Sequence, residues 1–475
     1  MKLYFYGGAK AVTGANYLLL GEPNAKGETT KILIDCGLTQ GTRKEEEKNY
    51  DPFPYDPKEI DALFITHAHV DHTGRIPYLY KLGFRGAIYS TAPTKDFAEE
   101  LLIDSQGLIE KEAKEDKHEP LYTLKDVTDS LNIWKRVRYH EPVRVKEFDA
   151  EFYDAGHILG SSFIRVTENP PVYKTGEAGP ADKKVSKKTI VFSGDIGNVK
   201  TPLVKDTEPL PEGTDYVVME ALYGDKIHEH TEDRKNVLED TIEEAVTAGG
   251  TLMIPAFAME RTQELLYEIN ELRENMRIPK TPVFIDSPLA IKLLAIYKKY
   301  SDDPEYFDSE AIDLFKRGDE IFNFPGLKFT LTTEQSKEIN DVSPPKIIIA
   351  GSGMSEGGRM IHHEYRYLGD QKSTILFISY QAPGSLGRKV LEGEKLVKIF
   401  GEEIVVRCRI RQIGGYSAHG DQKKLLGWLK PVKASVRKLC LVQSEDNAAT
   451  VFSGKVRDEL AIDTIIPEPG TAIDF

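Results

Sequence analysis

The chain has 475 residues, of which 40% are hydrophobic and 29% charged, an ordinary balance for a globular protein of two or three domains. The net charge of −14 weighs against a protein that coats nucleic acid, but not against an enzyme that binds it in one local cleft.

No stretch approaches the ~18 to 20 apolar residues of a membrane span. The first residues, MKLYFYGG, lack the apolar core of a signal peptide. The three cysteines lie too far apart for a disulfide framework or a CxxC site. We therefore expect a cytoplasmic protein with no membrane partner.

The first 60 residues predict consecutive strands. LYFYGG, NYLLLGE and TKILIDCG are rich in aromatic and β-branched residues and are separated by Gly, Pro and Asn. Asp35 ends the third of these strands. An aspartate at this position forms a turn more often than it acts chemically. If it lies under the histidine cluster that follows, it would instead orient a metal ligand.

The most informative stretch is ALFITHAHVDHTGRIPYL, residues 62–79. Its apolar beginning predicts a buried strand, and a helix is expected at its end. Between them stand His67, His69, Asp71 and His72, which are costly to bury unless each has a partner. An H-x-H pair alone is commonly an ordinary pair of histidines, but a strand followed by H-x-H-x-D-H and Thr-Gly is far more specific. His67 and His69 can aim at one ion, and Asp71 and His72 can serve a second.

Two further candidate metal ligands, His157 and Asp195, follow later in the first half of the chain. Residues 91–118 have helical spacing and end in a charged, solvated run. His157 then follows a strand in a turn with small neighbours, and residues 166–188 predict an exposed hairpin loop. Asp195 closes the strand TIVFSGD, where its carboxylate can lie between two ions. With the histidine cluster, these residues complete a nitrogen and oxygen ligand set for two metals.

The order Asp35, H67-A-H69-V-D71-H72, His157 and Asp195 resembles the motifs of the metallo-β-lactamase superfamily in its paired-metal form. The resemblance implies a first ion held by His67, His69 and His157. It implies a second ion held by Asp71 and His72, with Asp195 bridging the two.

Two motifs further along the chain resemble those of the β-CASP subgroup. VVMEALYGD (217–225) resembles its acidic motif and places Glu220 in the acidic position. GGYSAHGD (414–421) resembles its last histidine motif, which makes His419 a further ligand of the second ion. The likeness is closest to the bacterial and archaeal RNA-cleaving members, which are related to the endonuclease subunit of eukaryotic mRNA 3′-end processing.

The segment between these motifs alternates helices and strands. Its pattern predicts a parallel sheet with helices on its faces. The resemblance implies an α/β protein, in which a metallo-β-lactamase αββα sandwich carries an inserted β-CASP α/β domain. We place the first part of the sandwich at 1–222, the insertion at 223–395 and the returning part at 396–475.

Substrate contacts are expected in the insertion. The loop GSGMSEGGR (351–359) does not fit G-x-G-x-x-G, so it is either a backbone nest for phosphate or a simple turn. We expect Ser352, Gly353, Arg359 and His363 to contact phosphate. In the segment just after the insertion, Arg407, Arg409 and Arg411 alternate along a strand whose basic face is solvated or turned to RNA.

The sequence departs from the resembled endonucleases in three places. They use a histidine as proton donor where this chain reads GSLGRKVL, with Arg388 and Lys389 near that place. These two cations can bind phosphate, which leaves His419, or Glu220 with a water, as the proton donor. The chain also has LVQSEDNA where relatives often carry His-Gly-Glu, and Ala221 where a serine is common.

Together these features predict a zinc-dependent phosphodiesterase that cleaves single-stranded RNA as an endonuclease, a 5′ exonuclease or both. Two Zn²⁺ ions roughly 3.5 to 4 Å apart would share a hydroxide that attacks phosphorus. The catalytic group comprises Asp35, Asp71, Asp195, Glu220 and His419. The alternatives are a non-catalytic RNA-binding paralogue and a DNA or small-molecule hydrolase of the same superfamily. His69 argues against a flavodiiron-type oxidoreductase, and a homodimer is kept as one alternative for the oligomeric state.

Overall fold

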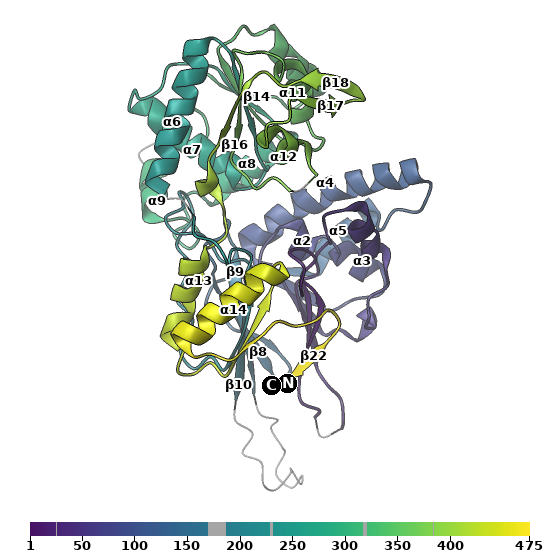
Figure 1. The fold of residues 1–475 in the computed structure, drawn as a ribbon. Coiled ribbons are helices and arrows are strands. Elements are labelled where there is room, and N and C mark those ends of the chain that lie inside the picture. Colours follow the sequence, from purple (N-terminus) through teal and green to yellow (C-terminus); the bar gives the residue numbers. More distant parts are fainter. Residues whose placement is uncertain (25, 170–186, 229–230, 317–320, 383) are drawn as a thin grey trace. The chain divides into compact units, whose positions relative to one another are not determined.

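In the computed structural model, residues 1–475 are described except 25, 170–186, 229–230, 317–320 and 383. The chain forms two compact units (Figure 1). The first contains Met1–Val199, Asp206–Ile227 and His419–Phe475, and the second contains Lys200–Lys205 and His228–Ala418. No helix in the described part of the chain is long and apolar enough to cross a bilayer.

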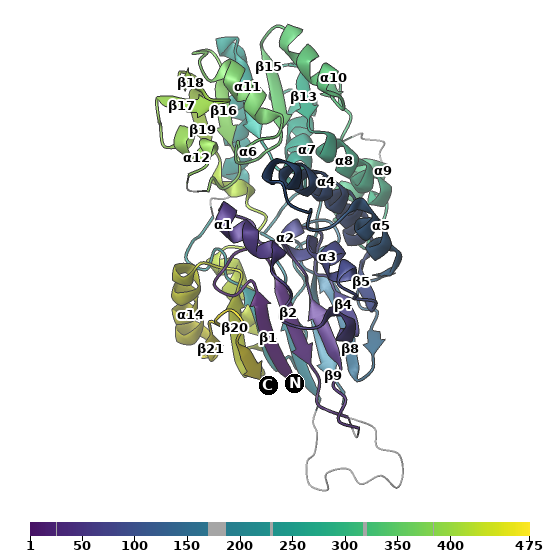
Figure 2. The same cartoon turned by 90° about the vertical axis from the view of Figure 1, so that its right-hand side faces the viewer.

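The first unit has two seven-stranded sheets. The first sheet has antiparallel pairs around β1 and β2 and parallel pairs from β3 to β6. Its strands, in spatial order, are β22 (Ala472–Asp474), β1 (Lys2–Gly7), β2 (Asn16–Leu20), β3 (Lys31–Ile34), β4 (Ala62–Phe64), β5 (Ala87–Thr91) and β6 (Trp134–Val137). The pairing of β1 with β22 brings the two ends of the chain together, as Figure 2 shows.

The second sheet mixes an antiparallel half with a parallel half. β7 to β10 pair antiparallel, whereas β10, β11, β20 and β21 run parallel. Its strands, in spatial order, are β21 (Thr464–Ile465), β20 (Lys438–Val442), β11 (Tyr216–Glu220), β10 (Lys188–Phe192), β9 (Ser162–Glu168), β8 (Phe148–Asp154) and β7 (Val143–Val145). The predicted hairpin is confirmed by the pairing of β9 with β10, and residues 170–186 of its loop lie outside the described part.

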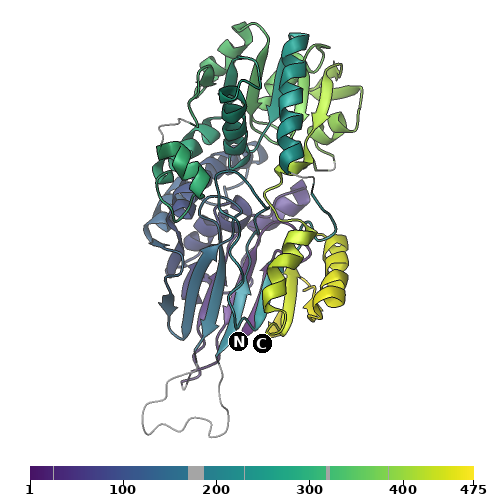
Figure 3. The same ribbon diagram turned by 90° about the vertical axis from the view of Figure 1, so that its left-hand side faces the viewer.

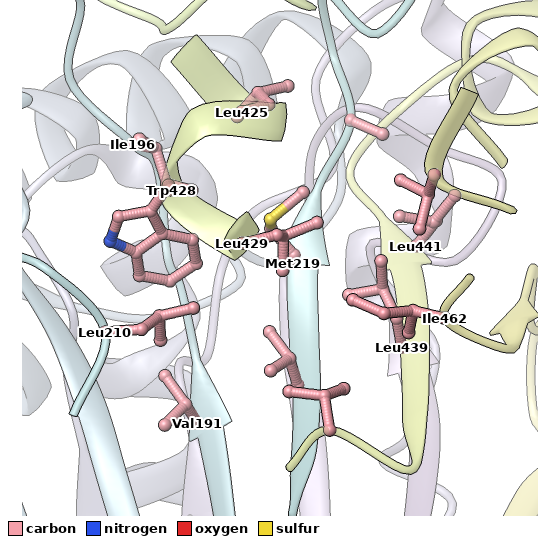
Figure 4. Packing of buried hydrophobic residues seen from close by; sticks show 14 of the residues in the cluster. Val191, Ile196, Leu210, Met219, Leu425, Trp428, Leu429, Leu439, Leu441 and Ile462 are labelled. Carbon is pink, nitrogen blue, oxygen red and sulfur yellow. The ribbon is translucent and has the colours of Figure 1, made fainter. Parts of the chain in front are cut away.

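The two sheets pack face to face, with helices on the outside. Rings of Phe64 and Phe152 meet 6.2 Å apart between the sheets. On the outer face of the second sheet, Trp428 and Met219 belong to one buried cluster (Figure 4), which also includes Phe452. Figure 3 shows the two helices that carry Trp428 and Phe452, in yellow, beside the strands. The helices of this unit are α1 (Arg43–Glu46), α2 (Val70–Thr73), α3 (Ile76–Lys81), α4 (Ala92–Asp116), α5 (Leu124–Asn132), α13 (Gln422–Leu429) and α14 (Asp446–Leu460), with 3₁₀ turns at Glu47–Tyr50, Pro57–Glu59 and Lys430–Val432.

The second unit is built on a six-stranded parallel sheet, as the alternating pattern predicts. Its strands, in spatial order, are β14 (Leu327–Phe329), β13 (Val283–Asp286), β15 (Lys346–Ala350), β12 (Thr251–Pro255), β16 (Thr374–Phe377) and β19 (Arg409–Gln412), and a separate hairpin joins β17 (Leu396–Ile399) to β18 (Glu402–Val405). Its helices are α6 (Thr231–Ala248), α7 (Arg261–Glu274), α8 (Pro288–Tyr300), α9 (Ser309–Lys316), α10 (Thr333–Glu338), α11 (Met360–Tyr367) and α12 (Leu386–Leu391), with 3₁₀ turns at Ile339–Asp341 and Gly414–Tyr416. The fold class predicted from the sequence is confirmed in both units.

The boundaries between the two compact units differ from the domain boundaries that we expected from the sequence. The hairpin of β17 and β18 and the strand β19 lie in the second unit, because β19 pairs in parallel with β16. The chain returns to the first unit at His419, whereas the prediction placed the return at 396. The long helix expected at 91–118 is confirmed as α4, which ends where Lys117 takes a left-handed backbone conformation.

A buried carboxyl group in the second unit predicts a pH effect on stability. Glu364 lies on α11 with no exposed surface, and its Oε1 accepts a hydrogen bond from the Ser355 hydroxyl at 2.5 Å. Burial raises the pKa of Glu364 from 4.5 to about 8, against the effect of that hydrogen bond. The unfolded chain therefore loses this proton at a lower pH than the folded chain does.

Because the folded pKa is raised, the stability due to this group is complete below about pH 4.5 and is lost as the pH rises to about 8. Glu364→Gln carries no such proton. The free energy of unfolding of the wild type is expected to fall, relative to this variant, by about 1.4 kcal/mol per pH unit between pH 5 and 7.5. Urea unfolding of both proteins across this range measures the difference. Parallel pH profiles would show that Glu364 is ionised in the folded state.

Candidate metal centre

The metal-binding motifs meet at the strand ends of the first unit. His67 follows β4, Glu220 is the last residue of β11, and Asp195 and Gln443 follow β10 and β20. Because β10, β11 and β20 are parallel, their carboxyl ends lie at one edge of the second sheet. Polar side chains from distant segments of the sequence therefore lie close together at this edge.

Four donor atoms form the first group: His67 Nε2, His69 Nδ1, His157 Nε2 and Asp195 Oδ2. His69 Nδ1 lies 3.0 Å from His67 Nε2 and 3.3 Å from His157 Nε2. The Asp195 oxygen lies 3.3 and 3.4 Å from the same two nitrogens. With bonds of about 2.0 to 2.1 Å, tetrahedral zinc places its ligand atoms about 3.3 to 3.4 Å apart. This donor set therefore fits one zinc ion.

The protonation of this group suits metal binding. Burial lowers the pKa values of His69 and His157 well below 6.5, and the neighbouring imidazoles lower them further. Both rings are therefore neutral and have a lone pair to offer. A neutral imidazole is the form that ligates metals.

A second group of donors shares Asp195. His72 Nε2 lies 3.3 Å from Asp195 Oδ1 and 3.8 Å from Asp71 Oδ2. Asp195 thus turns Oδ2 to the first group and Oδ1 to the second, as a bridging carboxylate would. His419 Nδ1 lies 4.0 Å from Asp195 Oδ2, the oxygen that also faces the first group, and it is the seventh ligand that the resemblance implies. The structure therefore brings all seven together.

Glu220 lies beside the last of these histidines. Its Oε1 accepts a hydrogen bond from the backbone N–H of Ile196 at 2.6 Å and lies 3.2 Å from His419 Nδ1. Burial alone would lower the pKa of His419, but the carboxylates of Glu220 and Asp195 raise it to about 9. The other oxygen of Glu220 is buried and has no hydrogen-bond partner among the described residues. The Glu220 carboxyl group therefore faces the ring nitrogen that also lies nearest Asp195.

Asp35 lies under the histidine cluster, where it was expected to orient a ligand. Its Oδ2 accepts a hydrogen bond from His72 Nδ1 at 2.7 Å. The backbone N–H and the hydroxyl of Thr66 each donate to this carboxylate at 2.8 Å. In the neutral ring this arrangement places the His72 proton on Nδ1 and leaves the Nε2 lone pair for a cation shared with Asp195.

A close approach of two loops holds His157 and Asp195 together. A Cβ atom added at Gly197 would lie 1.8 Å from the carbonyl oxygen of Gly156. Gly197 also forms an isolated β-bridge with His419. A larger residue at position 197 would therefore separate three ligands at once.

The residues expected to bind substrate all lie in the second unit. His363 Nε2 lies 2.7 Å from Asp286 Oδ2, and Arg359 donates to Asp286 Oδ1 at 2.8 Å. Arg359 also donates to the backbone carbonyl groups of Thr330 and Leu331. His363 is buried. Both side chains are thus engaged by a buried carboxylate, which sequence spacing did not indicate, and their contact with phosphate stays a prediction.

The other expected contacts are nearer the surface. Ser352 Oγ accepts from the backbone N–H of Glu356 at 3.0 Å, and the Gly353 carbonyl accepts from Gln381. Arg388 donates to Glu392 at 2.6 Å, while Lys389 is exposed on α12. Arg409 and Arg411 lie in β19 as predicted, whereas Arg407 precedes the strand, and Arg411 donates to Glu244. Phosphate binding by these groups also stays a prediction.

Gln443 is part of the centre and was missed as a functional residue. The only sequence signal was that LVQSEDNA differs from the relatives' pattern at the end of a predicted strand. The structure places its amide within 2.9 Å of both His72 and Asp195.

Three family models match the chain. Residues 26–172 match a metallo-beta-lactamase superfamily domain and residues 262–390 match the Beta-Casp domain. Residues 403–467 match a Zn-dependent metallo-hydrolase RNA specificity domain. The third model spans the end of the second unit and most of the returning part of the first.

Known proteins show the same likeness over most of the chain. Ribonuclease TTHA0252 of Thermus thermophilus is 35% identical, over 90% of this chain and 91% of its own. Transcription termination factor FttA of Methanocaldococcus jannaschii is 28% identical over 98% of this chain and 70% of its own. A crystal structure of a protein of unknown function from Enterococcus faecalis shares the fold, with a TM-score of 0.53 and 12% identity over 99% of each chain.

Proposed function

The chain belongs to the β-CASP group of the metallo-β-lactamase superfamily, a metal-dependent hydrolase family, and we propose that it is a two-zinc phosphodiesterase that cleaves single-stranded RNA. One observation carries the proposal most directly. Four histidines from distant segments, His67, His72, His157 and His419, lie within 4.0 Å of the two oxygens of Asp195, and His69 and Asp71 lie beside them. The name of the relative from Thermus thermophilus and the match to an RNA specificity domain support RNA as the substrate.

The donor chemistry supports zinc. The first group has three neutral imidazoles and one carboxylate, a set that zinc prefers over magnesium or calcium. His67, His69, His157 and Asp195 would hold one ion. Asp71, His72, Asp195 and His419 would hold the other. When bound, such ions acidify water toward hydroxide at neutral pH and neutralise the charge that develops on phosphoryl oxygens.

The protein's own residues orient this chemistry and move the protons. Asp35 accepts a hydrogen bond from His72 Nδ1 and so fixes the direction of the imidazole ring. Glu220 lies 3.2 Å from His419 Nδ1, and burial raises the pKa of its carboxyl group. We assign the protonation of the leaving oxygen to Glu220 with a water, because His419, as a ligand of the second ion, would be neutral. A cytoplasmic location and a homodimer stay predictions.

Metal removal tests the proposal. Dialysis against a chelator is expected to abolish cleavage of a single-stranded RNA, and added Zn²⁺ is expected to restore it. RNA labelled separately at its 5′ and 3′ ends distinguishes internal cuts from stepwise removal of nucleotides. The DNA of the same sequence and a lactone or thioester serve as comparison substrates. Full cleavage by a protein shown to be free of metal, or turnover of the small molecule alone, would contradict the proposal.

A further inference from the structure

Gln443 lies among the donors of the second cation position. It follows β20, its side chain is 4% exposed, and its backbone N–H donates to the carbonyl of Gly8 at 2.6 Å. Its amide nitrogen lies 2.8 Å from His72 Nε2 and 2.9 Å from Asp195 Oδ1. The glutamine is therefore held in place by its backbone and reaches two proposed ligands at once.

The amide nitrogen of Gln443 lies close to two atoms of the site that have lone pairs. Asp35 accepts a hydrogen bond from His72 Nδ1, so in the neutral ring that ligates a metal Nε2 offers a lone pair. One amide N–H can donate to this nitrogen and the other to the Asp195 oxygen. The amide protons thus use the same two lone pairs that the resemblance assigns to the second cation. The two amide hydrogens of Gln443, which carry partial positive charge, therefore face the same two atoms, His72 Nε2 and Asp195 Oδ1, that would bind the cation.

We propose that Gln443 is itself a ligand of the second cation, through its amide oxygen. A half-turn about the Cγ–Cδ bond exchanges the amide oxygen and nitrogen without changing the shape of the side chain. The oxygen then lies close to His72 Nε2 and Asp195 Oδ1, on the cation's side. Amide oxygens ligate divalent cations in proteins, although they bind zinc less strongly than imidazoles do. This inference rests on the proposed second metal site and adds a residue that its motifs do not include.

Metal binding tests the inference without reference to RNA cleavage. Metal-free protein is titrated with Zn²⁺ by equilibrium dialysis, and bound zinc is measured by mass spectrometry. Gln443→Leu keeps the volume but removes the donor, so the Kd of the second ion is expected to rise about 10- to 100-fold while that of the first is unchanged. Gln443→Glu supplies a charged oxygen and is expected to tighten the second ion. If Gln443→Leu fails to give a native circular dichroism spectrum, Gln443→Asn, which is too short to reach the cation position, takes its place with the same expected rise.

A buried glutamine elsewhere in the same unit provides the matched control. Gln106 lies on α4 and donates to Glu110 at 3.0 Å. Gln106→Leu is expected to leave both zinc affinities unchanged. A second ion that binds Gln443→Leu as tightly as the wild type, or more tightly, would overturn the inference, because the amide would then only fill or block the site.

The two proposals fail in different ways. If the wild type binds two ions and Gln443→Leu loses the second, but neither protein cleaves RNA, the proposed function fails and the role of Gln443 stands. If the wild type cleaves RNA with one bound ion, the role of Gln443 fails while the nuclease assignment stands.

Discussion

His69→Ala is expected to abolish RNA cleavage, with a loss of at least about a thousand-fold, while the protein stays folded. His69 Nδ1 lies within 3.3 Å of both His67 Nε2 and His157 Nε2, so the three nitrogens can bind one ion. The variant removes one of these three ligands. The side chain is only partly buried, and its removal leaves the strands around it intact. Cleavage of labelled RNA under single-turnover conditions measures the effect, and circular dichroism checks the fold.

Two further variants make this test specific. Asp71→Ala removes a donor of the second group and is expected to cause a comparable loss. His118→Ala removes an exposed histidine of the same unit, whose ring lies against Tyr50 and whose Nδ1 lies 2.9 Å from the carbonyl oxygen of Glu119, and it is expected to keep full activity. Full activity in His69→Ala or Asp71→Ala would contradict the two-metal assignment.

The metal centre could be predicted because its residues carry local signals. His67, His69, Asp71 and His72 follow one strand within six residues, and their types suit no ordinary core. His157 and Asp195 gave weaker signals, and only their order along the chain joined them to the cluster. The convergence that the structure shows depends on the parallel pairing of β11 with β10 and with β20, which no local spacing encodes.

Gln443 could not be recognised for a related reason. A glutamine after a strand is common and indicates no function by itself. Its role depends on its contacts with Asp195 and His72, which lie 248 and 371 positions away in the sequence. The same holds for Arg359 and His363. Their nearness to a glycine loop suggested phosphate, whereas the structure pairs them with Asp286 on another strand.

The fold of the second unit followed from its alternating pattern, but its end did not. Strands such as β12 and β15 are strongly apolar and fit the alternating pattern of helices and strands. β19 carries exposed arginines and resembles any surface strand, so only its pairing with β16 shows that it belongs to this sheet. The sequence therefore predicted the kind of domain better than where it ends.

A buried ion pair in the second unit gives the largest expected effect on stability. Arg234 on α6 is 1% exposed, and two of its nitrogens donate to Glu268 Oε1 on α7, at 2.7 and 3.1 Å. Its third nitrogen donates to the Gly415 carbonyl at 2.9 Å, and its guanidinium lies 4.4 Å from the ring of Tyr416. The hydroxyl of Tyr416 donates to the other oxygen of Glu268. One arginine thus joins two helices to the segment that leads into the His419 motif.

Arg234→Met keeps much of the volume but leaves the carboxylate of Glu268 buried without its cation. Removing one partner of such a pair costs about 3 to 5 kcal/mol. We therefore expect this loss in the free energy of opening of α6 and α7, measured by hydrogen exchange of their peptides at increasing urea. Arg234→Met combined with Glu268→Leu is expected to recover part of the loss, because no charge is then left buried, although the Tyr416 hydroxyl loses its acceptor.

An exposed pair in the same unit is the matched control. Arg277 donates to Glu239 on α6, and 40% of its side chain is exposed. Arg277→Met is expected to cost less than about 1 kcal/mol, because water screens this pair and solvates the carboxylate that is left behind. Equal losses in the two variants would show that Arg234 acts through packing alone. A loss confined to Arg234→Met, partly reversed in the double variant, would show that the uncompensated charge of Glu268 is what destabilises the unit.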